Sequence, residues 1–93
     1  MAAHSTTHNE TLSRVARIEG QVRAVRRMIE DGQYCIDIIN QVQAARAALQ
    51  SLSNQILEKH LTHCVSNALN SRDEGEIDQK LDEIMKLIKR MQK

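Results

Sequence analysis

Apolar side chains recur along this chain at the spacing of an α-helix. In the first third they stand at alternating steps of three and four residues, which places them on one stripe of a helix expected from about Asn9 to Glu30. The members of this stripe are Val15, Ile18, Val22, Val25 and Ile29. Asp31 and Gly32 follow, and a glycine just past the last apolar position is a typical helix stop.

A second and much longer helix is expected to begin near Gln33 or Cys35. From Ile36 onward the chain has no Gly or Pro until Gly75, and a helical apolar face continues to about Leu69. This face holds Ile39, Val42, Leu49, Leu52, Ile56 and Val65. About 35 residues of helix span roughly 50 Å, so the first helix cannot cover the second one along its whole length.

A third helix follows a turn expected at residues 70–76, NSRDEGE. Its apolar positions are Ile77, Leu81, Ile84, Ile88 and Met91, and charges of both signs occupy its other face. The pattern predicts an all-α chain with a short, a long and a short helix. Because one chain leaves apolar surface of the long helix uncovered, we expect two chains to form an antiparallel four-helix bundle.

The composition is consistent with a small helical protein. The 93 residues include no Pro, Phe or Trp, a single Tyr and three Gly, and they suffice for one domain. We expect a flexible tail over residues 1–8 and one helical domain over 9–93. No apolar run is long enough to cross a bilayer and the start, MAAHSTTHNE, does not resemble a signal peptide, so a cytoplasmic protein without membrane contact is expected.

The candidate chemistry lies in HLTHC, residues 60–64. His60 and Cys64 are four residues apart on a predicted helix, so an imidazole and a thiolate could share one metal ion, whereas His63 points about 60° away. Cys35 lies 25 residues before His60, about 37 Å along a helix. An antiparallel dimer would bring Cys35 of one chain to the other chain's His60 and Cys64. The alternative is a chance pair with inert, packed cysteines.

Basic residues cluster early in the chain. Residues 14–27 contain five arginines against Glu19 alone, a local charge of +4. Arg46 is the only charged residue between Asp37 and Glu58, where a buried ion would need a partner such as a phosphate. An anionic partner is therefore one interpretation. The other is that Arg23, Arg26 and Arg27 form surface ion pairs with Glu19, Glu30 and Asp31.

Three segments together carry a family resemblance: RVARIEGQVRAVRRMIEDGQYC, QVQAARAALQSL and EKHLTHC. They strongly resemble the CsoR/RcnR/FrmR family of bacterial metal- and aldehyde-sensing transcriptional repressors, over about residues 10–90. The resemblance implies dimers that pair into a tetramer, a ligand-free form that binds operator DNA, and release of DNA by the effector. It also implies that Arg14, Arg17 and Arg46 contact DNA.

Within this family the residues favour copper. The copper(I) sensors have Cys, His and Cys at the sensory positions, which here are Cys35, His60 and Cys64. Two soft thiolates with one imidazole also suit Cu(I) on chemical grounds. The resemblance further assigns Tyr34 to a network that links the metal site to the third helix. In similar copper sensors a carboxylate of the third helix belongs to this network. The corresponding position here is Lys80, so that Glu76 or Glu83 would have to supply the carboxylate.

The residues are also compatible with other functions. A Ni(II)-sensing repressor would add a ligand such as His4, or His8, from the N-terminal segment. A thiol-based persulfide or aldehyde sensor would use Cys35 and Cys64, although similar persulfide sensors lack the His and similar formaldehyde sensors lack the second Cys. A structural helical oligomer without a ligand is a third possibility. An enzyme is not expected, since the chain shows no Ser/His/Asp or paired-carboxylate arrangement.

Overall fold

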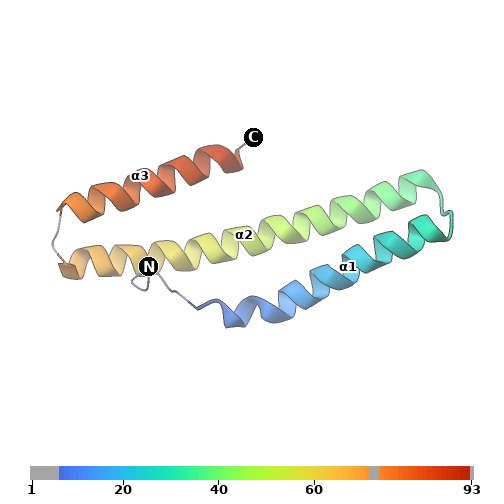
Figure 1. Ribbon diagram of the computed structural model, residues 1–93, viewed down its shortest axis with the longest axis horizontal. Helices are drawn as coiled ribbons and strands as arrows, with labels where there is room; N and C mark the ends of the chain where they lie inside the picture. Colours follow the sequence, from blue (N-terminus) through green and yellow to red (C-terminus); the bar gives the residue numbers. More distant parts are fainter. Residues whose placement is uncertain (1–6, 72–73, 93) are drawn as a thin grey trace. The chain divides into compact units, whose positions relative to one another are not determined.

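The computed structural model describes residues 7–71 and 74–92 and confirms the all-α prediction. The elements are a 3₁₀ turn η2 (Asn9–Thr11) and the helices α1 (Leu12–Glu30), α2 (Cys35–Ser71) and α3 (Glu74–Met91), with no strand among the described residues (Figure 1). The chain divides into two compact units, one ending at Glu58 and the other beginning at Lys59. We describe each unit separately. The expected tail at 1–8 falls mostly outside the described residues, and one domain over 9–93 remains a prediction.

The first α-helix begins three residues later than expected because residues 9–11 form a tighter turn. The Thr11 hydroxyl donates a hydrogen bond of 2.6 Å to the His8 carbonyl, and the Thr11 N–H donates to the same carbonyl at 2.9 Å. Thr11 is buried, so both of its donors are satisfied locally. The 3₁₀ turn therefore replaces the first turn of the expected α-helix.

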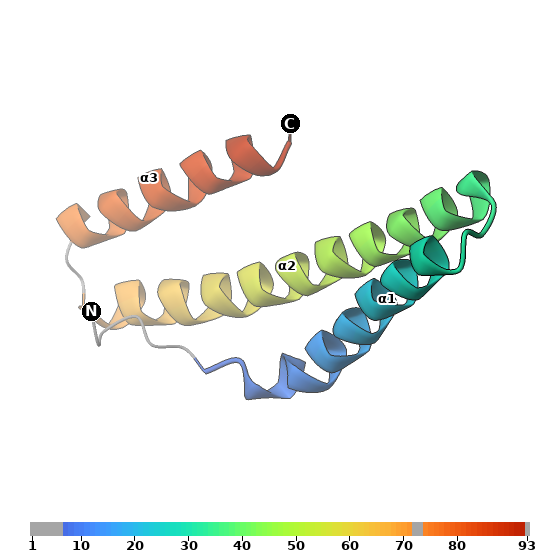
Figure 2. The same ribbon diagram turned by 45° about the vertical axis from the view of Figure 1, so that its right-hand side comes forward.

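The connection between α1 and α2 is closed by a Schellman motif. Gly32 has φ +67°, the Gly32 N–H donates to the Ile29 carbonyl at 3.1 Å, and the Gln33 N–H donates to the Met28 carbonyl at 3.0 Å. The left-handed conformation favours glycine, as the sequence predicted. The chain then reverses, and α1 lies beside the first half of α2 in two views (Figures 1 and 2).

The first unit has a small core and much exposed apolar surface. Ile18 of α1 and Ala45 of α2 are buried, at 5% and 7% exposure. Between the two helices runs an open groove of about 460 Å³, lined by Val15, Ile18, Glu19, Val22, Arg23, Leu49 and Leu52. Val22 and Leu49 are about half exposed. The predicted apolar stripe is thus present, and a single chain covers only part of it.

The second unit pairs the end of α2 with α3. Ile84 is buried, whereas Leu81 and Met85 remain more than half exposed. The expected turn over residues 70–76 is shorter in the structure: α2 continues to Ser71 and α3 begins at Glu74. Glu74 and Glu76 lie in the first turn of α3, where carboxylates interact favourably with the helix dipole. Within the described residues, no helix has the length and apolarity required to span a membrane.

Candidate metal centre

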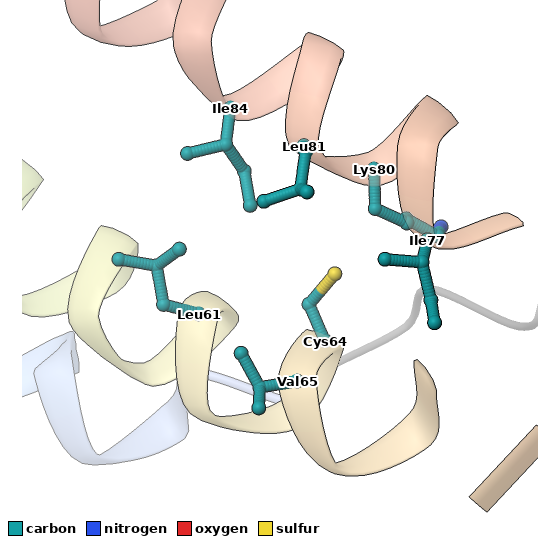
Figure 3. Close-up of a pocket in the computed structure, with 7 residues that line it drawn as sticks. All are labelled: Leu61, Cys64, Val65, Ile77, Lys80, Leu81 and Ile84. Carbon is teal, nitrogen blue, oxygen red and sulfur yellow. The ribbon is translucent and has the colours of Figure 1, made fainter. Parts of the chain in front are cut away.

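Cys64 lies in the last third of α2 and is one of the few buried residues of the described chain, at 9% exposure. Its sulfur points into a pocket of about 180 Å³ between α2 and α3 (Figure 3). The pocket is lined by Leu61, Cys64, Val65, Ile77, Lys80, Leu81 and Ile84. The thiol therefore faces an almost entirely apolar surface.

This environment changes the acidity of the thiol. Burial raises the pKa of Cys64, and the carboxylates of Glu83 and Glu76 raise it further because a negative charge disfavours a nearby thiolate. The metal-free protein accordingly holds Cys64 as a neutral thiol over a wider pH range than an exposed cysteine. A soft metal ion that binds the thiolate must displace this proton.

His60 lies one helical turn before Cys64 and is half-buried, whereas His63 is exposed. Both residues belong to the same unbroken helix as Cys64, because residues 35–71 form one α-helix without Gly or Pro. Positions four residues apart lie on the same face of a helix, so one imidazole and one thiol lie near each other in this unit. These two side chains are the candidate donors for a soft metal ion that one chain brings together.

Cys35 and Tyr34 lie at the other end of α2. Cys35 is the first residue of the helix and is exposed, and Tyr34 immediately precedes it with 69% exposure. The single chain does not unite the three predicted ligands: among residues 7–71 and 74–92, no three His, Cys, Asp or Glu side chains gather into a metal-binding group.

Of the two N-terminal histidines, the structure describes only His8. His4 lies outside the described residues. His8 is half-buried at the start of η2, and its Nδ1 atom is buried without a hydrogen-bond partner in the described structure. No metal-ligating group of three side chains includes His8 within the described part of the chain. Participation of either histidine in metal binding remains a prediction.

The helix α3 supplies the charged groups around Cys64. Glu76 and Glu83, the two carboxylates considered as substitutes at Lys80, both act electrostatically on the thiol. Sequence reasoning missed that Lys80 itself lines the pocket (Figure 3). The signal was available, because Lys80 lies three residues after Ile77 and four before Ile84 and therefore shares their face of α3.

The predicted DNA-contacting residues belong to the other unit. Arg14 and Arg17 on α1 and Arg46 on α2 are all exposed, and in the described structure none of their side chains forms a hydrogen bond or ion pair. Arg26 differs from these three, since it pairs with Glu30 at 3.3 Å. The structure thus confirms one of the ion pairs considered from the sequence.

Comparisons with known proteins identify the class. A family model of metal-sensitive transcriptional repressors matches residues 7–90. The copper-sensing transcriptional repressor RicR of Mycobacterium tuberculosis is 41% identical over 92 residues, which cover 97% of this chain and 95% of RicR. The crystal structure of the copper-sensing repressor CsoR with Cu(I) from Geobacillus thermodenitrificans is 45% identical with a TM-score of 0.81, covering 95% and 92% of the two chains. The nickel-responsive transcriptional regulator InrS is 32% identical with a TM-score of 0.75, covering 91% and 92%.

The chain therefore belongs to the family of metal-sensitive transcriptional repressors. It is a metal-sensing repressor of the CsoR type and not an enzyme, and the resemblance inferred from its sequence motifs is confirmed. Among its relatives, RicR and CsoR sense copper and InrS responds to nickel.

Proposed function

We propose that this protein is a Cu(I)-responsive repressor in which Cys35, His60 and Cys64 bind the metal. The metal-free protein binds operator DNA, and Cu(I) releases it. The observation that carries the proposal is the half-buried His60 one turn before the buried Cys64, in a chain similar to two copper sensors. The apolar pocket around Cys64 offers no carboxylate or carbonyl among its described lining side chains, which favours a soft ion.

The third ligand, Cys35, comes from a second chain in this proposal. Cys35 begins α2, while His60 and Cys64 lie in its last third, so an antiparallel partner would bring the two ends together. The half-exposed Val22 and Leu49 beside the open groove support self-association, because burying such residues stabilises an oligomer. We infer a dimer, and a dimer of dimers as the family resemblance implies.

DNA binding is assigned to Arg14, Arg17 and Arg46. Their exposure, and the absence of side-chain partners for them in the described structure, support contact with phosphate. We infer recognition mainly through the phosphate backbone and DNA shape. Cu(I) acts on these contacts by changing how the two ends of the long helices are held together.

A Ni(II)-responsive repressor is the second candidate, and the similarity to InrS supports it. Nickel would require an additional nitrogen donor, for which His4 is the candidate. The identity is higher to RicR (41%) and to the CsoR of Geobacillus thermodenitrificans (45%) than to InrS (32%), and this difference together with the two thiols favours Cu(I).

The test is an anaerobic titration of the reduced protein with Cu(I) and with Ni(II), each in competition with a chelator of known affinity, followed by operator binding. We expect one Cu(I) per chain and loss of operator affinity, with no comparable effect of Ni(II). Release by Ni(II) alone would establish the second candidate. Operator binding that ignores both metals but is lost with a persulfide or an aldehyde would indicate a thiol-based sensor.

A further inference from the structure

The middle of α2 has polar side chains but no carboxylate. Between Ile38 and Leu57 the sequence contains no Asp or Glu, and Arg46 is the only charged residue. The helix α3 is different, because it has charges of both signs and an Asp82–Lys86 ion pair at 3.0 Å. A polyanion such as DNA can therefore approach this part of α2 without meeting a negative charge on that helix.

Three exposed residues form a row along this part of the helix. Arg46, Gln50 and Asn54 are four residues apart, so they lie on neighbouring turns of one face. The Gln50 Nε2 atom donates a hydrogen bond of 3.0 Å to the Asn54 Oδ1 atom. Because an amide NH₂ group has two hydrogens, Gln50 keeps one N–H donor and its carbonyl oxygen for another partner. The row thus combines a cation with an amide that is held in place.

The remaining donor and acceptor of Gln50 match the edge of adenine. In the major groove of DNA, adenine presents the N7 acceptor and the N6 amino donor, and a Gln or Asn amide can pair with both at once. An α-helix fits into this groove. The hydrogen bond to Asn54 also reduces the side-chain freedom that Gln50 loses on binding. Gln50 is therefore suited to contact a base, and the neighbouring Arg46 is suited to contact a phosphate.

We propose that Gln50 recognises an adenine in the major groove and thereby adds base specificity to the operator contact. This inference rests on the function proposed above, in which Arg46 binds a phosphate one helical turn away. Phosphate contacts and DNA shape supply most of the affinity, and the Gln50 amide discriminates A·T from the other base pairs. Asn54 is a positioning residue, because it acts through its hydrogen bond to the Gln50 amide.

Selection of binding sites from a pool of random-sequence duplex DNA tests this inference on the metal-free protein. The readout is the base frequency at each position of the selected duplexes. Gln50→Ala should lose the preference for A·T at the position that Gln50 contacts, with a loss of about ten-fold in affinity for A·T relative to G·C there. Gln50→Arg should instead prefer G·C at that position, because arginine pairs with N7 and O6 of guanine. Asn54→Ala should weaken the A·T preference.

Gln79→Ala is the matched control, because Gln79 is an exposed amide on α3, and it should leave every base preference unchanged. If the bond between Gln50 and Asn54 only stabilised the helix, both Gln50 variants would select the same bases as the unmodified protein, which would overturn the inference alone. Gln50 variants that dissociated into single chains would assign the amide to a contact between chains and would also overturn it. An unmodified protein that selected no sequence would contradict the proposed repressor function as well.

Discussion

At the scale of single residues, Cys64 and His60 have different environments and should have different roles. Cys64 is buried in an apolar pocket, where a thiolate is unfavourable until a metal ion neutralises it. His60 is half-buried one turn away. Two thiolates can bind Cu(I) in a linear arrangement without help. In the proposed site, the imidazole is therefore the donor that converts binding into a change of helix geometry.

This distinction predicts that His60→Ala separates affinity from regulation. The variant should keep substantial Cu(I) affinity through Cys35 and Cys64 but lose much of the coupling to DNA, which is about 1–3 kcal/mol in typical allosteric proteins. The measurement is operator affinity with and without Cu(I). His63→Ala is the matched control, because His63 is exposed, and it should respond normally. A His60→Ala protein that still released DNA fully would show that the imidazole is not the switch.

The raised pKa of Cys64 predicts a pH dependence of stability in the metal-free protein. An acid whose pKa is higher in the folded state binds its proton more tightly there. The resulting contribution to the free energy of unfolding is fully present below the pKa of cysteine in the unfolded chain, about 8.5. It is lost as pH rises through the higher pKa of Cys64 in the folded chain. Between these values, the free energy of unfolding should fall more steeply with pH in the unmodified protein than in Cys64→Ala.

Urea unfolding from pH 7 to pH 10, at one protein concentration, measures these slopes. Cys35→Ala is the control, because Cys35 is exposed, and it should keep the steep slope of the unmodified protein. Equal slopes for Cys64→Ala and the unmodified protein would contradict the effect of burial and of the carboxylates of Glu83 and Glu76.

At the scale of the helices, the turn after α1 depends on one backbone conformation. Gly32 has φ +67°, and a Cβ added there would meet nothing within 4 Å. Gly32→Ala should therefore be destabilised by backbone strain alone, by about 1–2 kcal/mol. Gly20→Ala is the opposite case: Gly20 lies inside α1, and an added Cβ would lie 3.8 Å from the flexible end of Arg23. It should be stabilised by about 0.5–1 kcal/mol.

Thermal unfolding of both variants at equal protein concentration checks this prediction. We expect Gly20→Ala to have the highest melting temperature, the unmodified protein an intermediate one and Gly32→Ala the lowest. If Gly32→Ala melted at the temperature of the unmodified protein, the Schellman motif would not contribute to stability.

The basic surface of α1 and α2 predicts a general loss of DNA affinity in Arg46→Ala. Arg46 is exposed, and it lies in a section of α2 without other charged residues. Loss of one phosphate contact should weaken binding to operator and unrelated DNA alike and lower the salt slope by about one. Self-association and Cu(I) affinity should persist. A dissociated or unfolded variant would instead assign Arg46 to the oligomer interface.

The helices could be predicted from the sequence because their signals are local. The spacing of Val15, Ile18 and Val22, and a glycine after α1, determine which face packs and where the helix ends. The start of α1 was predicted too early, since the local bonds of Thr11 to the His8 carbonyl compete with an α-helical turn. Spacing along α2 likewise identified His60 and Cys64 as neighbours.

The pocket at Cys64 was harder to predict because it depends on a different helix. Its walls come from α3, and the register between α2 and α3 cannot be read from either pattern alone. The pKa shift of Cys64 depends on this same packing. Cys35 was predicted as a ligand, and this stays a prediction, since a single chain leaves Cys35 exposed and apart from any group of three donors in the described residues.

At the scale of the whole molecule, the proposed dimer accounts both for the exposed apolar surface and for the separation of the predicted ligands. A single chain leaves Val22, Leu49, Val65 and Leu81 at least half exposed and separates Cys35 from His60 and Cys64 along the sequence. A second chain in antiparallel orientation would cover apolar surface and supply the missing thiolate. The central claim is therefore that Cu(I) binds between two chains and thereby releases DNA.

Mixing two defective variants tests this claim most directly. Cys35→Ala and Cys64→Ala are each unable to form a complete site in a homodimer. When equal amounts of the two variants exchange chains at random, half of the dimers contain one chain of each kind. Each of these mixed dimers holds one complete site, so the mixture should bind about one Cu(I) tightly per four chains. Operator DNA should be released from the mixture by Cu(I) and from neither variant alone. A mixture that bound no more Cu(I) than its separate components, and kept its operator DNA, would contradict a shared site.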